Sequence, residues 1–173
     1  MAKISNISAY PSIANLDSAD YLVITDAEND LMTKTATIGQ LQALFGIDTL
    51  VAKVTLNNAS LLTLGGISAT LIAAPGLNKV LDIISIMVYV DAGAVAFDFA
   101  GALTLDVGGV NLDTINQTVF NSTTDVVYKP VVDSNLIGVN QPLLLEVAQN
   151  PTQGTGVVYL NINYRVLTVG SSF

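Results

Sequence analysis

The stretch from Lys79 to Val90, KVLDIISIMVYV, constrains the fold of this chain more than any other part of the sequence. Six of the eleven residues after Lys79 are β-branched, and the eight residues between Asp82 and Asp91 carry no charge. β-branched side chains favour strands because a helix restricts their χ1 rotation. The stretch therefore predicts a β-strand. It is too short to cross a bilayer as a helix, which takes about 20 apolar residues.

This predicted strand is apolar at both even and odd positions, although a sandwich strand normally needs only one apolar face. The last predicted strand, VVYLNINYRVLTV from Val157 to Val169, keeps its apolar residues mainly on one face. The second face of the 80–90 strand therefore needs a cover. A neighbouring subunit is the simplest cover, and the chain's own loops or N-terminal module are the alternative. The residues predicted to contact a neighbouring subunit are Ile84, Ile86, Met87, Val88 and Tyr89.

Charged residues are scarce in this sequence. They make up 12% of the chain, against about 25% in a typical soluble domain, while 51% of residues are hydrophobic and the mean hydropathy is +0.57. A solitary globule of this composition exposes large apolar patches, and such patches usually mark interfaces. We therefore expect extensive burial between copies of the chain.

The charge pattern excludes two classes of partner. The net charge is −8, and the six basic residues are scattered singly, so the phosphates of a nucleic acid are repelled rather than bound. Anionic membrane surfaces are disfavoured for the same reason. The longest uncharged stretch, Val54 to Asn78, is interrupted by glycines and by Pro75-Gly76, so it does not predict a membrane-spanning helix. We expect neither a nucleic-acid nor a membrane partner.

Glycine usage divides the chain near Gly46–Leu50. Residues 1–50 hold two of the 13 glycines, and residues 51–173 hold the rest. In the first region, YLVIT and MTKTATI predict a β-hairpin, followed by a short helix. Thr37 and Gln40 have the spacing of a capping box, in which each side chain bonds the other residue's backbone N–H. So small a region has a marginal core of its own.

The second region predicts a mainly β fold, a jelly-roll-like antiparallel β-sandwich. Turns are expected at Pro75-Gly76, as the centre of a type II turn, and at Asp91–Gly93, closing a hairpin. The predicted strands are KVTL, LLTL, ATLIAA, KVLDIISIMVYV, AVAFDFA, LTLDV, DVVY, PLLLEVAQ and VVYLNINYRVLTV.

No residue pattern in the sequence indicates a catalytic reaction. The chain has no His, Cys or Trp, so Ser–His–Asp catalysis, thiol chemistry and His-based metal sites are absent from it. Asp98 and Asp106 lie on adjacent predicted strands and could form a carboxylate pair for glycoside hydrolysis, but exposed strand positions explain them as well. We expect no enzyme, no catalytic residue and no cofactor.

Two binding sites remain as alternatives from the sequence. DAEND, from Asp26 to Asp30, superficially suits Ca²⁺, although a solvated hairpin turn explains it equally well. We therefore expect no metal. Tyr128, Tyr159 and Tyr164 could stack on sugars, with Tyr164 predicted to point inward.

Two segments resemble tailed-bacteriophage virion proteins. ISAYPSIANLDSADYLVITDAENDLMTKTATIGQLQALF resembles a module found at the start of many such proteins, and SATLIAAPGLNKVLDIISIMVYVDAGAVAF resembles phage structural proteins with a compact β-sandwich. Together they resemble head-fibre or capsid-decoration (auxiliary capsid) proteins. The resemblance is one of pattern and covers roughly residues 4–100. The chain lacks the collagen-like or heptad repeats of a fibre shaft.

The resemblance implies a homotrimer on the capsid exterior of the virion, assembled in the host cytoplasm, with the major capsid protein or other virion proteins as partners. It implies that residues 1–50 are a capsid-anchoring arm and hairpin-helix module, and that residues 51–173 are the trimerisation and outer domain. A tail-fibre or receptor- or glycan-binding tip is the alternative. The residues implied in anchoring are Ile4, Ile7, Tyr10, Pro11, Tyr21, Leu41 and Phe45.

Overall fold

In the computed structural model, the described residues are 21–26, 32–40, 49–132 and 138–170, and the chain separates into two compact units, Met1–Asp48 and Thr49–Phe173. In the first unit, β1 (Tyr21–Asp26) pairs antiparallel with β2 (Met32–Thr37), which confirms the predicted hairpin.

The predicted capping box is also present in the first unit. The Thr37 N–H donates to Oε1 of Gln40 at 2.9 Å, and the Gln40 N–H donates to Oγ1 of Thr37 at 3.0 Å. Residues 38–40 are helical, and the rest of the predicted helix lies outside the described residues.

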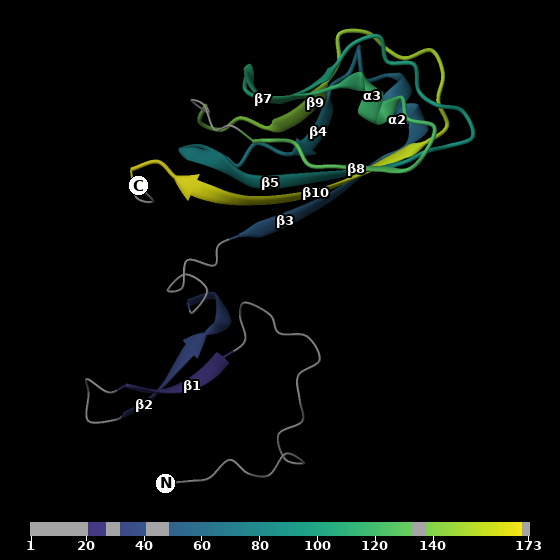
Figure 1. Ribbon diagram of the computed structural model, residues 1–173. Helices are drawn as coiled ribbons and strands as arrows, with labels where there is room; N and C mark the ends of the chain where they lie inside the picture. Colours follow the sequence, from purple (N-terminus) through teal and green to yellow (C-terminus); the bar gives the residue numbers. More distant parts are fainter. Residues whose placement is uncertain (1–20, 27–31, 41–48, 133–137, 171–173) are drawn as a thin grey trace, which may run out of the picture. The chain divides into compact units, whose positions relative to one another are not determined.

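The second unit is a β-sandwich of two four-stranded antiparallel sheets, which face each other in Figure 1. One sheet has the order β3 (Leu50–Leu56), β10 (Val157–Thr168), β5 (Lys79–Asp91), β8 (Val126–Tyr128). The other has the order β4 (Ala69–Ile72), β9 (Leu143–Glu146), β6 (Leu103–Val107), β7 (Val110–Ile115). The first strand of the sandwich lies beside the last, as in a jelly roll. The predicted fold class is confirmed.

Leucine, isoleucine, valine and phenylalanine side chains fill the space between the two sheets. At the end where α2 (Asn58–Leu62) and α3 (Gln117–Phe120) lie (Figure 1), the core becomes aromatic. The Phe97 and Phe99 ring centroids are 5.6 Å apart, and those of Phe99 and Phe120 are 5.8 Å apart in an edge-to-face arrangement. No helix within the described ranges is long and apolar enough to span a bilayer.

Two predicted strands are wrong because side chains satisfy the backbone in their place. LLTL belongs instead to α2 and the turn after it, since Asn57 caps the helix by accepting a hydrogen bond from the Ser60 N–H at 2.9 Å. AVAFDFA is not a strand, and no hairpin closes at Asp91–Gly93. The Asn121 side chain bonds both the N–H and the C=O of Phe99 at 2.9 Å, which replaces the ladder of a neighbouring strand.

Two further features differ from the sequence-based expectation. β7 was not predicted, because VNLDTI contains Asn and Asp, which are depleted in strands. The turn before β5 has Leu77 and Asn78 at its centre rather than Pro75 and Gly76, since the Lys79 N–H donates to the Gly76 C=O at 3.2 Å. Asn78 has φ of 58°, a left-handed conformation that asparagine tolerates better than most residues.

A β-bulge in the middle of β5 changes which side chains face the core. Ser85 pairs with Asn163, and Ile83 pairs with Tyr164, so Ile84 is an extra residue in β5 with no partner in β10. The inward-facing residues of β5 are Leu81 and Ile83 before the bulge, and Ile86, Val88 and Val90 after it.

The bulge therefore explains much of the two-sided apolar pattern of β5 without a second cover. The prediction that Ile86 and Val88 contact a neighbouring subunit is corrected, because both side chains are fully buried in the chain's own core. Ile84, Met87 and Tyr89 face outward or lie partly exposed.

Deleting Ile84 tests the bulge. When Ile84 is removed, Ile83 and Ser85 become neighbours, and the side chains of β5 then alternate between the core and solvent along the whole strand. The deletion variant is therefore expected to keep a cooperative unfolding transition with little loss of stability. Deleting Met87 instead turns Ile86, or Val88 and Val90, away from the core, at about 1.5–3 kcal/mol for each exposed side chain. Denaturant unfolding followed by circular dichroism measures both variants, and equal destabilisation of the two would contradict the bulge.

Candidate functional site

The exposed side of the sheet β3-β10-β5-β8, called the outer face below, carries large apolar side chains in contact with solvent. Their exposed fractions are 65% for Val127, 54% for Val51, 50% for Met87, 47% for Ile84 and 41% for Tyr159. Strand alternation places these side chains opposite the core residues of the same strands. The outer face thus brings these five exposed apolar side chains to one side of a single sheet.

Cross-strand pairing fixes the neighbours on the outer face. Tyr159 of β10 lies directly between Thr55 of β3 and Tyr89 of β5. Asn161 lies between Lys53 and Met87 in the next outward row. These two rows form the apolar half of the outer face.

Tyr89 and Tyr159 form a stacked aromatic pair on neighbouring strands. Their ring centroids are 5.9 Å apart with an interplanar angle of 21°. The Tyr89 hydroxyl donates to Oδ2 of Asp125 at 3.0 Å, and Oδ1 of Asp125 accepts from the Ala92 N–H at 3.0 Å. The hydrogen bond to the Asp125 carboxylate raises the pKa of Tyr89 above its ordinary value, because it stabilises the protonated phenol.

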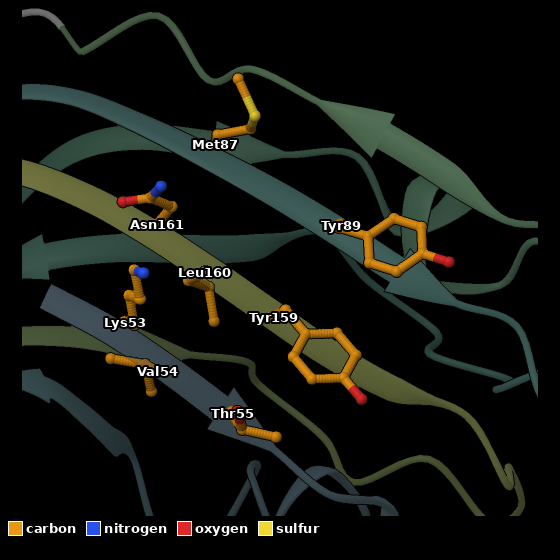
Figure 2. Close-up of a pocket in the computed structure, with 8 residues that line it drawn as sticks. All are labelled: Lys53, Val54, Thr55, Met87, Tyr89, Tyr159, Leu160 and Asn161. Carbon is orange, nitrogen blue, oxygen red and sulfur yellow. The ribbon is translucent and has the colours of Figure 1, made fainter.

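A small depression of about 200 Å³ lies beside the tyrosine pair. Figure 2 shows both tyrosine hydroxyls directed away from Lys53, Met87 and Asn161. The volume is below the ~300 Å³ at which small-molecule pockets begin. The lining residues are Lys53, Val54, Thr55, Met87, Tyr89, Tyr159, Leu160 and Asn161. The shape suits contact with another surface better than enclosure of a small ligand.

In the other half of the outer face, which also holds Val51 and Ile84, the polar groups bond one another. The Asn163 amide donates to the Ser85 hydroxyl at 2.9 Å. Nε of Arg165 donates to Oδ2 of Asp82 at 2.9 Å, and this ion pair is partly buried. These groups are already satisfied within the sheet, so the apolar half is where a partner gains most by covering the surface.

Asp98 and Asp106, which were considered from the sequence as a carboxylate pair, each hydrogen-bond to a loop or turn of the fold. Asp98 accepts hydrogen bonds from the Thr152 hydroxyl and from the Thr152 and Gln153 N–H groups, and the Thr152 hydroxyl bond is the main reason that its pKa is lowered. Asp106 is nearly buried and accepts from the Gly109 N–H at 2.8 Å in the β6–β7 turn. Each carboxylate thus holds a loop or turn.

Of the three tyrosines considered for sugar stacking, Tyr128 and Tyr164 pack against the core, and Tyr159 is the exposed one. Among the described residues, no cluster of three acidic side chains is arranged to hold a metal ion. Within DAEND, residues 27–30 lie outside the described residues.

The residues implied in capsid anchoring fall almost entirely outside the described residues. This applies to Ile4, Ile7, Tyr10, Pro11, Leu41 and Phe45. Tyr21 begins β1, with only its backbone described. Anchoring by this set stays a prediction.

Sequence reasoning missed two outer-face residues, Asn161 and Lys53, and it considered Tyr159 for sugar stacking but not as a neighbour of Tyr89. Asn161 and Lys53 share the row of Met87, and Tyr159 shares the row of Tyr89. The exposed register of β10 was visible in its alternation, but its placement between β3 and β5 depends on the order of the strands.

No family model and no curated protein matches this chain. Among solved structures, the chain is similar to one described as "Cyanophage Pam1 capsid asymmetric unit". That match has a TM-score of 0.46 and 18% sequence identity, and it covers 68% of this chain and 84% of the other. A similarity of this size does not establish a family.

Replacing Asp125 with Asn is expected to lower the pKa of Tyr89 towards the ordinary value for tyrosine, about 10. Because folding raises this pKa, the stability that it contributes is present below the unfolded-state value and is lost as the pH rises through the folded-state value. ¹³C NMR of ring-labelled tyrosine, assigned with Tyr89→Phe, measures the titration. Asp113→Asn, on the other sheet, is the control. An unchanged Tyr89 titration in Asp125→Asn would contradict the described hydrogen bond.

Proposed function

We propose that this chain is a non-enzymatic virion structural protein of a tailed bacteriophage, which decorates and stabilises the capsid exterior as a homotrimer. Residues 1–50 attach it to the major capsid protein or another virion protein, and residues 51–173 form the trimerisation and outer domain. Its proposed partners are therefore further copies of itself and the capsid shell.

The observation that carries the proposal is the apolar half of the outer face. Val127, Met87 and Tyr159 are each 41% exposed or more on adjacent strands, in a chain with only 12% charged residues. Exposed apolar surface of this kind marks protein contacts. The resemblance of residues 4–100 to head-fibre and capsid-decoration proteins supports a virion as the place of those contacts.

The proposed mechanism is mechanical. Each contact between apolar side chains gains roughly 25 cal/mol per Å² of apolar surface removed from water. A trimer joins three N-terminal modules, so capsid binding by one module raises the effective concentration of the other two. Individually weak anchors then hold neighbouring capsid subunits together.

A receptor- or glycan-binding tip is the second candidate, and the exposed Tyr89–Tyr159 pair favours it. Aromatic faces next to amide and ammonium groups, here Asn161 and Lys53, suit a sugar. Binding of a glycan by the full chain that is lost in Tyr159→Ala, without effect on capsid binding, would favour this function over trimerisation through the outer face.

Removing residues 1–48 tests the division of roles. All buried core residues that the structure describes lie in the second unit, so the truncated chain is expected to fold and to trimerise. It is expected to lose binding to capsids, because the proposed anchor is gone. Co-sedimentation with particles that lack the protein measures binding, with the full chain as the control. Decoration of particles by the truncated chain would refute this assignment.

A further inference from the structure

Opposite charges lie at two edges of the outer face, and the fold keeps them apart. Lys53 is exposed on the edge strand β3, in the row of Asn161 and Met87. Asp91 ends β5 four residues beyond Met87 and faces the same side by strand alternation. At about 3.3 Å per residue and about 4.8 Å between strands, the backbones of Lys53 and Asp91 are roughly 16 Å apart. They are too far apart to pair within one chain.

Neither charge is paired within the described part of the chain. There, the ion pair on the outer face is the one between Arg165 and Asp82 in its polar half. Asp125 lies near Asp91, but its two oxygens already accept hydrogen bonds from Tyr89 and Ala92. Lys53 and Asp91 are therefore left for a partner to neutralise, together with Lys129, which is exposed one residue beyond β8, and the Asp125 carboxylate.

Each of the two edges also carries an exposed valine beside its charge. Val51 lies two residues from Lys53 on the same side of β3 and is 54% exposed. Val127 pairs with Tyr89 from β8, next to the Asp91 edge, and is 65% exposed. Both edges therefore offer exposed apolar side chains. The β3 edge carries Lys53, whereas the carboxylates of Asp91 and Asp125 outnumber Lys129 at the β5–β8 edge, so the net charges of the two edges are opposite in sign and complementary.

We propose that the partner that covers the outer face is a second copy of this chain, with the β3 edge of one copy against the β5–β8 edge of the next and Lys53 paired with Asp91. This inference rests on the proposed function, because a closed three-fold ring is built from heterologous contacts in which two different patches meet. Strand pairing places the tyrosine pair and Met87 between Lys53 and Asp91, so a neighbouring copy that overlaps this part of the outer face covers them as well. Exclusion of water there strengthens the ion pair.

Charge reversal in the full chain tests this contact by sedimentation velocity. Lys53→Glu and Asp91→Lys each bring like charges together and are expected to weaken self-association at least about tenfold. The double variant exchanges the two charges and is expected to associate within about threefold of the wild type, as coupled neighbours do. Lys79→Glu makes the same charge change at an exposed site outside the outer face and is expected to leave association unchanged.

An equimolar mixture of the two single variants distinguishes a three-fold ring from a two-fold dimer. In a dimer, mixing places opposite charges in both contacts and restores association fully. In a ring of three, two neighbours always carry the same variant, so one contact stays mismatched and recovery is partial. Full recovery would support the Lys53–Asp91 contact and contradict the trimer.

The failure of this inference and that of the proposed function are distinguishable. Wild-type association of Lys53→Glu, or failure of the double variant to associate while it stays folded by circular dichroism, would overturn the contact and leave the trimer unaffected. A wild-type chain that sediments as a monomer at every concentration would overturn both.

Discussion

The β-bulge at Ile84 determines which side chains of the longest strand build the core and which remain on the surface. One extra residue shifts the inward positions from odd to even numbers, so that Ile83 and Ile86 both reach the core. The same shift turns Met87 and Tyr89 outward, opposite Asn161 and Tyr159 of β10. Without the bulge, one half of β5 would present its core residues to solvent. The apolar half of the outer face therefore depends on this single irregularity of the sheet.

Because charged residues are scarce in this chain, their positions on the outer face indicate what kind of partner covers it. The chain places an ion pair and an amide–hydroxyl bond on one half of the outer face, where they satisfy each other. On the other half it leaves Met87, Tyr159 and Val127 exposed, with Lys53 and Asp91 unpaired among the described residues. A surface that combines apolar exposure with separated opposite charges is best completed by another copy of itself, since each copy supplies what the other lacks.

Local sequence signals predicted the elements whose cause is local. The hairpin, the Thr37–Gln40 capping box and the alternating strand β10 follow from residues within a few positions of each other. The segment containing Phe99 was wrongly predicted as a strand, because the side chain of Asn121, far along the chain, bonds its backbone N–H and C=O groups. The bulge at Ile84 could not be predicted from local sequence either, because it is defined by the pairing of β5 with Asn163 and Tyr164 of β10.

The outer-face residues show the same difference between what local sequence predicts and what depends on distant parts of the chain. The apolar run predicted Ile84, Met87 and Tyr89 as surface contacts. It assigned Ile86 and Val88 to the wrong side, because a run without polar residues does not show which of its side chains face the core. The complementarity of Lys53 and Asp91 required the order of the strands across the sheet, which no local pattern contains.

The central claim, that another copy covers the apolar half of the outer face, is tested most directly by the oxidation of Met87. This side chain is 50% exposed in the single chain, and its oxidation rate reports whether a neighbour covers it. The full chain is treated with peroxide over a dilution series, and Met87 sulfoxide is quantified by mass spectrometry. Covering by a second copy predicts slow oxidation at high protein concentration and faster oxidation on dilution. A rate that is fast and independent of concentration would contradict the claim.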